Sequence, residues 1–190
     1  MVRRKTGPLA ILALGAASLS GASLSIQDVN GVPRFPLNPE GKASVLFFVL
    51  SDCPISNGYA PEIQRICSDY APRKVSCDLV YVDPDIKTAD VKKHVAEYGY
   101  ARIPAILDST QTLVHAAGAT ITPQAAIINP SGQVLYLGRI DNLYAALGKK
   151  RPEATERDVR KALDEILSGK LVSTPRTKAI GCYIPPPGVK

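Results

Sequence analysis

A cysteine lies at the exit of the most apolar run in the chain. In SVLFFVLSDCPISN, which spans residues 44–57, two polar residues separate this run from Cys53, and Pro54 comes next. Proline suits the first turn of a helix, where its missing N–H leaves no helical hydrogen bond unmade. Because a helix N-terminus favours negative charge, it stabilises a thiolate. The pattern predicts a reactive redox cysteine; a small helix-capping residue or half of a structural disulfide is the alternative.

The partner cysteine of a paired redox motif does not follow Cys53. Ser56 stands three residues on, and a serine cannot form a disulfide. Cys182 lies in a tail beyond the last expected helix, directly after Gly181, and glycine permits a close backbone approach. We expect Cys182 to reach Cys53 and either to resolve a sulfenic acid or mixed disulfide there, or to hold it in a permanent bridge.

Two further cysteines, Cys67 and Cys77, lie near the end of the first expected helix and just before the second expected strand. Four cysteines allow three disulfide pairings, and the sequence alone does not choose among them. If Cys53 and Cys182 pair, we expect Cys67 and Cys77 to form a structural disulfide, which stabilises the fold by roughly 3 kcal/mol in the chain-entropy model. Two free buried thiols are the alternative.

The first 22 residues have the layout of a secretory signal peptide. Arg3, Arg4 and Lys5 precede an apolar stretch over residues 8–19, and small residues follow. We therefore expect an exported protein, periplasmic or extracellular, in a compartment where disulfides persist. An uncleaved N-terminal anchor is the alternative, and it is the one membrane association that we expect. Cleavage lowers the formal net charge from +6 to +3 because three cations leave, and this balance favours neither nucleic acid nor a membrane surface as a partner.

The rest of the chain alternates apolar strands with amphipathic helices. A continuous apolar run predicts a strand buried on both faces, and apolar residues at three- and four-residue steps predict helices. We expect Thr88 and Thr155 to cap two of the helices, and Pro61 to kink the first one. The expected strands span 44–50, 78–83, 103–107, 125–129 and 133–140, and the expected helices 54–70, 88–98 and 155–168, with a short helix or turn at 111–117. This order predicts an α/β fold in which a central mixed sheet has helices on both faces.

Four stretches of the sequence resemble the thioredoxin-like redoxin superfamily. In chain order they are FFVLSDCPISN (47–57), LVYVDPD (79–85), IPAILDSTQTLVHAAGA (103–119) and ATITPQAAIINPSGQVLYLGRID (119–141). Over about residues 30–168 the chain is similar to the branch labelled alkyl hydroperoxide reductase/thiol-specific antioxidant. The resemblance implies a thioredoxin-like domain at 23–170, followed by a C-terminal tail at 171–190 that carries Cys182.

The resemblance also assigns site residues. It implies that Pro123 is a cis-proline facing Cys53, and that the backbone at Thr122 is free to pair with an extended substrate chain. An ordinary trans proline is the alternative, and Pro104 is a rival for the role. Further contacts with substrate are expected from Pro54, Ser56 and Asn57.

The chain departs from both standard mechanisms of this superfamily. A serine replaces the second cysteine of the Cys-x-x-Cys motif, and Leu46 and Leu50 stand where a peroxiredoxin carries proline and threonine. We therefore expect a thiol–disulfide oxidoreductase with antioxidant activity, whose substrate or electron donor is another thiol or disulfide protein. A peroxide reductase is one alternative. A non-catalytic binding module with a permanent Cys53–Cys182 bridge is the other.

No cofactor is expected, because the sequence contains no nucleotide, flavin or haem motif. No metal site is expected either: His94 and His115 are not at ligand spacing, and each is expected at a partly exposed position. Convergence of Cys53, Cys182 and one histidine on a soft ion such as Cu(I) is the alternative.

Overall fold

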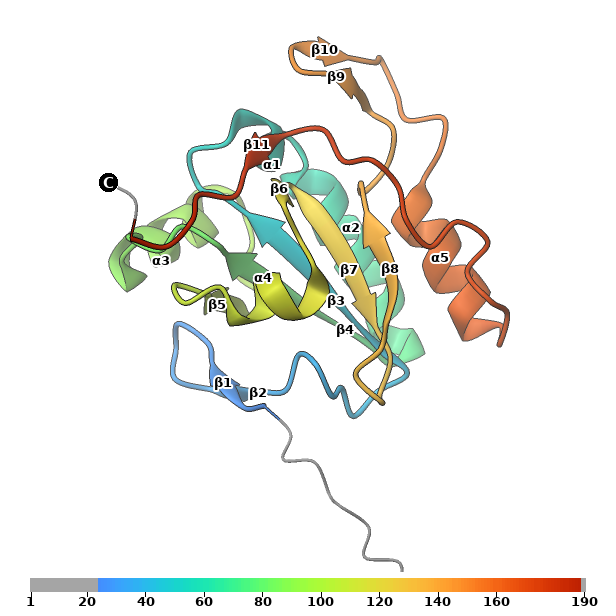
Figure 1. Cartoon of the computed structure of the whole chain (residues 1–190), viewed down its shortest axis with the longest axis horizontal. Coiled ribbons are helices and arrows are strands. Elements are labelled where there is room, and N and C mark those ends of the chain that lie inside the picture. The colour runs from blue at the N-terminus through green and yellow to red at the C-terminus, as the bar shows by residue number, and fades with distance from the viewer. Residues whose placement is uncertain (1–23, 189–190) are drawn as a thin grey trace, which may run out of the picture.

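A five-stranded mixed sheet forms the centre of the molecule (Figure 1). The computed structural model describes residues 24–188, so the expected signal peptide at 1–22 lies outside the described residues. The strands are β3 Ala43–Val49, β4 Val75–Tyr81, β5 Ala105–Leu107, β7 Gln124–Ile128 and β8 Val134–Gly138, in the order β5-β4-β3-β7-β8. The β3–β4 and β4–β5 pairs are parallel, whereas β7 is antiparallel to both β3 and β8. This arrangement confirms the predicted α/β fold with a mixed sheet.

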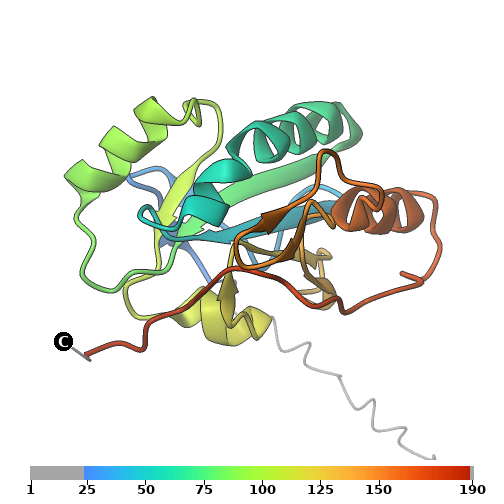
Figure 2. The same cartoon turned by 90° about the horizontal axis from the view of Figure 1, so that it is seen from above.

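Helices lie on both faces of the sheet, as the sequence predicts. They are α1 Pro54–Gly58, α2 Ala60–Tyr70, α3 Thr88–Glu97, α4 Thr112–Ala117 and α5 Asp158–Leu167. Seen from above, α2 and α3 lie on one side of the sheet and α4 on the other (Figure 2), while α5 packs against β7 and β8. The central strand β3 is buried over its whole length, which explains why its sequence is continuously apolar.

The helix predicted over residues 54–70 is two helices in the structure. The first, α1, ends at Gly58, and α2 begins at Ala60 after the single residue Tyr59. Pro61 lies in the first turn of α2, where its missing N–H costs no helical hydrogen bond, so it starts a helix instead of kinking one. After the break, α2 packs along β4 while α1 carries Cys53 at its start.

Neither threonine that the sequence predicts as a helix cap has that role. Thr88 is already the first residue of α3, and the N-cap is Lys87, without a side-chain hydrogen bond. The helix α5 begins only at Asp158, and Thr155 interacts instead with Asn142, whose Nδ2 donates to Thr155 Oγ1 over 2.8 Å. A tertiary contact therefore decides the role of Thr155, and such a contact is not visible in the local sequence.

Two short strand pairs lie outside the central sheet. In one, β1 Ile26–Gln27 pairs with β2 Pro33–Arg34; in the other, β9 Tyr144–Ala146 pairs with β10 Lys149–Lys150. Strands of two or three residues are too short to show the alternation by which a strand is recognised in a sequence. Within residues 24–188, no helix has the length and apolar character needed to cross a membrane.

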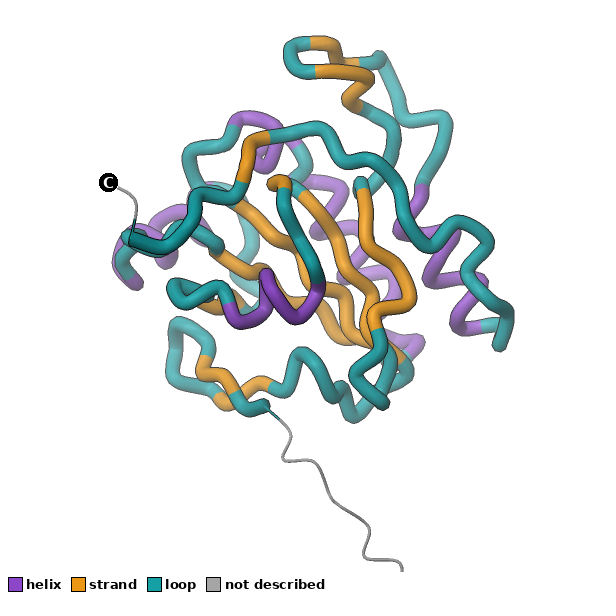
Figure 3. Tube along the Cα trace, in the orientation of Figure 1, coloured by secondary structure: helices purple, strands orange, loops and turns teal. Residues whose placement is uncertain are grey.

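The C-terminal tail crosses the end of the sheet, and its hydrogen bonds include contacts with β8 and with β6 (Figure 1, Figure 3). Beside β8, the Leu137 N–H donates to the Pro175 carbonyl over 3.0 Å, and the Thr177 N–H donates to the Leu137 carbonyl over 3.3 Å. Further along, β11 Cys182–Tyr183 pairs antiparallel with β6 Ile121–Thr122. The tail that the sequence predicts as irregular is thus partly a strand.

Candidate functional site

Cys53 is positioned by the end of β3 and the start of α1. It is the N-cap of α1 and has extended backbone angles, φ −84° and ψ 112°. Its N–H donates to the Leu50 carbonyl over 3.3 Å, and its own carbonyl accepts the Asn57 N–H over 3.0 Å. These two hydrogen bonds fix the backbone on both sides of the cysteine. Its side chain is 1% exposed, so other parts of the chain cover the sulfur in this form.

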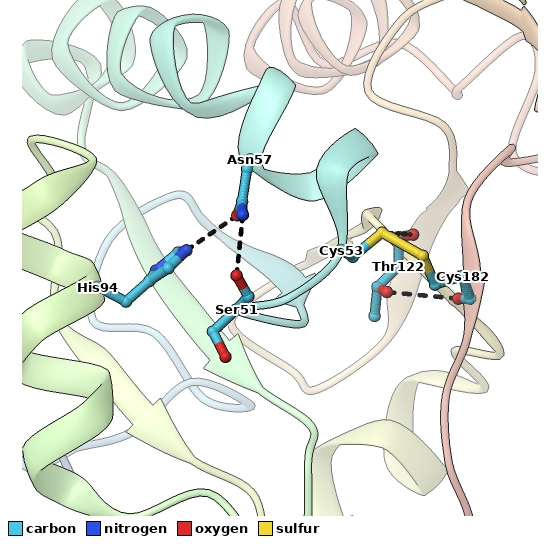
Figure 4. The surroundings of a disulfide bond; sticks show 6 residues. All are labelled: Ser51, Cys53, Asn57, His94, Thr122 and Cys182. Carbon is cyan, nitrogen blue, oxygen red and sulfur yellow. Dashed lines mark hydrogen bonds between the residues drawn. A yellow bond between two sulfur atoms is a disulfide. The ribbon is translucent and has the colours of Figure 1, made fainter. Parts of the chain in front are cut away.

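Cys53 is bonded to Cys182 of the tail (Figure 4). Their Cα atoms are 6.3 Å apart, within the range that a disulfide spans without backbone movement. The bond joins residues 129 positions apart in the sequence and fixes the tail over the turn that carries Cys53. Among the described residues, the bond present is thus the one that connects the tail to the predicted reactive position.

The segment before β7 forms the third part of the site. The Thr122–Pro123 peptide bond is cis, and the Thr122 carbonyl oxygen lies 3.5 Å from Cys53 Sγ. Thr122 is buried, and its hydroxyl donates to the Cys182 carbonyl over 3.3 Å. The segment that the resemblance implies beside Cys53 therefore adjoins both bonded cysteines.

Gly181 lets the tail approach this segment closely. A Cβ atom at Gly181 would collide with the backbone carbonyl of Thr122 and would crowd the ring of Pro123. The requirement is for space, since Gly181 does not have a positive φ. The close approach that the sequence predicts at this glycine thus depends on its missing side chain.

A chain of hydrogen bonds, buried at Tyr81 and partly buried at Asn57, supports the turn that carries Cys53. Asn57 Nδ2 donates to the Ser51 carbonyl over 2.8 Å, and Asn57 Oδ1 lies 2.9 Å from His94 Nε2 (Figure 4). On the other side of the ring, the Tyr81 hydroxyl lies 2.8 Å from His94 Nδ1. Because the amide oxygen can only accept, Nε2 carries a proton. Burial favours the neutral imidazole by lowering the pKa of His94, and in that form Nδ1 accepts from the Tyr81 hydroxyl. Both ends of the partly buried Asn57 amide are engaged in these hydrogen bonds, which hold the turn, and the expected contact of Asn57 with substrate stays a prediction.

His94 is buried, at 6% exposure, whereas the sequence predicts a partly exposed helix residue. The signal was present in α3: Val91 and Tyr98 lie three residues before and four residues after His94, on the same face of the helix. The imidazole stacks on the Tyr98 ring, with 4.4 Å between centroids. Burial lowers the pKa of His94 below its ordinary value of 6.5.

The buried imidazole predicts a pH-dependent stability. As the pH falls below 6.5, the unfolded chain binds a proton at His94 while the folded protein does not, so the free energy of unfolding should decrease from pH 7 to pH 5. His94→Leu should cost about 1–3 kcal/mol at pH 7, because it leaves the buried Tyr81 hydroxyl and the partly buried Asn57 amide oxygen without this partner. It should also flatten the pH dependence. Urea unfolding at pH 5, 6 and 7 measures both effects, with the exposed His115→Leu as the matched control; an equally steep dependence in His94→Leu would contradict this role.

The other residues of the Cys-Pro-Ile-Ser motif differ in exposure. Pro54 is exposed at the start of α1, where a substrate can touch it. Ser56 is 1% exposed, and among the described residues its hydroxyl has no hydrogen-bond partner. In this disulfide-bonded form Ser56 is therefore not on the surface that a substrate contacts, contrary to the expectation from the sequence.

Cys67 and Cys77 are free thiols in the structure instead of the expected disulfide. Cys67 lies in α2 and Cys77 in β4, against which α2 packs, so the two side chains meet. A hydrogen bond with Cys67, together with burial, raises the pKa of the Cys77 thiol. The sequence thus predicts correctly that Cys67 and Cys77 lie together, but their contact is a hydrogen bond between thiols and not a disulfide.

Within residues 24–188, no group of three or more His, Cys, Asp or Glu side chains is arranged to hold a metal ion. His115 is exposed on α4, as expected, and His94 is bonded to Asn57 and Tyr81. Neither histidine therefore joins the two bonded cysteines as a ligand.

The sequence matches the profile of one known protein family over about half of its length. The profile of a family described as thioredoxin-like matches residues 41–134, which include Cys53 and Pro123. No curated protein matches the chain.

Several solved structures have a similar architecture. An uncharacterised conserved protein from Geobacillus kaustophilus is 26% identical, with a TM-score of 0.72, over 88% of this chain and 92% of that one. A hypothetical protein from Sinorhizobium meliloti is 24% identical, with a TM-score of 0.73, over 88% and 93%. A secreted disulfide oxidoreductase from Mycobacterium tuberculosis, described as homologous to E. coli DsbE, is 15% identical, with a TM-score of 0.52, over 77% and 96%. At these identities, the similarity to the last two structures supports a shared fold and nothing more.

Proposed function

We propose that the chain, which belongs to the thioredoxin-like redoxin superfamily, is an exported thiol–disulfide oxidoreductase in which Cys53 exchanges disulfides and Cys182 resolves them. The observation that carries the proposal is the bond between Cys53 and Cys182 beside the Thr122–Pro123 peptide. The bond links a cysteine at the start of a helix to a cysteine on a separate tail. A mechanism in which one cysteine attacks the substrate and a second releases it needs such a pair of sulfurs. The narrower resemblance to the alkyl hydroperoxide reductase/thiol-specific antioxidant branch stays a prediction.

Two exchange steps make up the proposed reaction. In the reduced protein, the Cys53 thiolate attacks a substrate disulfide R–S–S–R′, forms the mixed disulfide Cys53–S–S–R and releases R′–S⁻, which takes up a proton. The Cys182 thiolate then attacks Cys53 Sγ, closes the Cys53–Cys182 bond and releases R–S⁻. The substrate gains two electrons and the protein loses two. The reverse sequence oxidises a dithiol substrate.

In the oxidised protein, the two bonded cysteines differ in their exposure to a reductant. Cys53 is 1% exposed, whereas Cys182 is only partly buried. We therefore expect a donor thiolate to attack Cys182 first, so that Cys53 leaves as the thiolate. The donor in this proposal is another thiol protein, because a dithiol supplies both electrons.

Export is part of the same proposal. The first 22 residues carry the charge and the apolar pattern of a signal peptide. The Mycobacterium tuberculosis oxidoreductase with a similar fold is described as secreted. An oxidising compartment also favours the persistence of a disulfide such as Cys53–Cys182.

Titration in redox buffers tests the proposed function. We expect a two-electron transition between about −270 and −120 mV, the range of proteins that exchange disulfides. Alkylation followed by mass spectrometry should count two free thiols in the oxidised protein, Cys67 and Cys77, and four in the reduced protein. Cys182→Ser is the control, because it cannot form the bond. A midpoint below about −300 mV would instead favour a permanent bridge in a non-catalytic binding module.

A further inference from the structure

A cavity of about 880 Å³ lies between α2 and the loop of residues 99–103, which follows α3. Both helices are on the same side of the sheet (Figure 2). Gln64 Nε2 donates to the Tyr98 carbonyl over 2.8 Å, and this bond ties α2 to the start of the loop. Of the described residues that line the cavity, none belongs to the turn of Cys53 or to the tail. Since small-molecule sites in proteins have volumes of roughly 300–1,000 Å³, the cavity is large enough for a small ligand.

A thiol lies in the wall of this cavity. Cys67 of α2 lines it and is partly exposed. Cys77 lies beside Cys67 in β4, is 8% exposed, and forms a hydrogen bond with it. This bond and burial raise the pKa of the Cys77 thiol, so Cys77 keeps its proton and can donate a hydrogen bond to the Cys67 sulfur. A thiolate that accepts a hydrogen bond is stabilised. Of the two free thiols, Cys67 is thus the one that a ligand in the cavity contacts.

The lining of the cavity favours a ligand with negative charge. Among the described residues, those that line it include two arginines, Arg65 and Arg102, and no acidic side chain. Arg65 pairs with Glu62, but Glu62 also pairs with Arg157 and Arg160, so three cations share one carboxylate. Much of the remaining lining is proline, alanine and isoleucine. The cavity therefore fits a small molecule that carries negative charge and also has some apolar surface.

We propose that this cavity binds small disulfides that carry carboxylates, and that Cys67 exchanges with them to become reversibly thiolated. Disulfides are the class that a thiolate attacks to form a reversible covalent bond. Cys67 is a free thiol while the Cys53–Cys182 bond is closed, so this second thiol site works without the first. The inference goes beyond the proposed function and does not depend on it.

One exchange step makes up the reaction at Cys67. Its thiolate attacks one sulfur of a disulfide R–S–S–R, forms the mixed disulfide Cys67–S–S–R, and releases R–S⁻, which takes up a proton. The thiol of Cys67 is oxidised, and one half of the small disulfide is reduced. Arg65 and Arg102 attract the carboxylates of the incoming molecule. An excess of the small thiol reverses the step, so the degree of thiolation follows the ratio of the small disulfide to its thiol.

Glutathione disulfide, in excess, tests the site on the oxidised full chain, where Cys53 and Cys182 are bonded to each other. We expect one glutathione per chain, located on Cys67 by peptide mapping without reduction, and removed by dithiothreitol. Cys67→Ser should lose the adduct, whereas Cys77→Ser should keep it. The absence of an adduct, an adduct on Cys77, or a Cys67–Cys77 bond in place of the adduct would overturn the inference. None of these outcomes affects the proposed exchange at Cys53.

Cystamine, a small disulfide with positive charge, tests the charge preference. The rate with each disulfide is divided by its rate with N-acetylcysteine amide, which corrects for intrinsic reactivity. We expect the corrected rate at low salt to be about tenfold higher for glutathione disulfide than for cystamine, and the difference to shrink as salt is added.

A charge reversal in the lining gives the matched test. Arg102→Glu should lower the corrected rate of glutathione disulfide about fivefold and raise that of cystamine, because it replaces an attractive charge by a repulsive one. Lys149→Glu is the control, since it makes the same reversal at an exposed position of β10, outside the cavity, and should change neither rate. Equal corrected rates for the two disulfides, or rates in Arg102→Glu that match those in Lys149→Glu, would contradict the proposed site.

Discussion

Cys53→Ser will abolish disulfide exchange, and Cys182→Ser will stop the reaction at the mixed disulfide. The first change removes the nucleophile that begins the proposed reaction, so the exchange rate should fall by at least about 10³-fold. The second leaves the nucleophile but removes the sulfur that resolves the intermediate. Insulin reduction in the presence of dithiothreitol measures the rate for Cys53→Ser. For Cys182→Ser, the reduced protein is mixed with insulin without dithiothreitol, and intact mass under non-reducing conditions identifies the trapped species.

Cys67→Ser is the matched control for both variants. Cys67 is a free thiol in α2, away from the bonded pair, so its loss should leave exchange unchanged. Exchange by Cys53→Ser at the wild-type rate would place the activity at another thiol. Turnover by Cys182→Ser without a trapped intermediate would show that an external thiol, and not the tail, resolves the mixed disulfide.

Opening the Cys53–Cys182 bond will lower the free energy of unfolding by about 5 kcal/mol. The bond joins residues 129 positions apart, so it restricts most of the described chain in the unfolded state. In the chain-entropy model, a longer closed loop gives a larger stabilisation, which grows with the logarithm of its length. Urea unfolding of the oxidised wild-type protein and of Cys182→Ser, without reductant, measures the difference.

The same experiment with reductant supplies its control. Reduced wild-type protein and Cys182→Ser lack the same bond, so their free energies of unfolding should agree. Cys67 and Cys77 are already free thiols in the structure, and reduction should not change their contribution. A difference below about 1 kcal/mol between the oxidised wild-type protein and Cys182→Ser would contradict the loop-closure argument.

The central part of the fold could be predicted because it follows from patterns that are local in the sequence. The apolar run of β3 reflects burial on both faces of a central strand. The stripe of Val159 and Leu163 indicated α5, and both residues are buried. The helix boundaries were not predicted correctly. Pro61 begins α2 because the helix breaks after α1, and Thr155 bonds to Asn142 instead of capping α5.

The site was predictable in its parts but not in its assembly. Cys53 after an apolar strand and the Thr122–Pro123 pair were visible as motifs, whereas the pairing of β11 with β6 was not. That pairing involves two residues on each strand, 60 positions apart between Thr122 and Cys182. The prediction for His94 is wrong for a different reason: a polar residue on an apolar helix face can be buried when it has partners, and His94 links Asn57 to Tyr81.

Thr177 sets how far Cys182 can travel once the disulfide opens. Its hydroxyl lies 2.6 Å from the Tyr136 hydroxyl and accepts the Arg139 N–H over 3.0 Å. Only five positions separate this anchor from Cys182, so a fully extended chain keeps the thiol within roughly 18 Å of Thr177. A thiol tethered in so small a volume has an effective concentration in the millimolar range. In the proposed reaction, the tether then governs the lifetime of the mixed disulfide, and an external thiol must exceed that local concentration to react with it before Cys182 does.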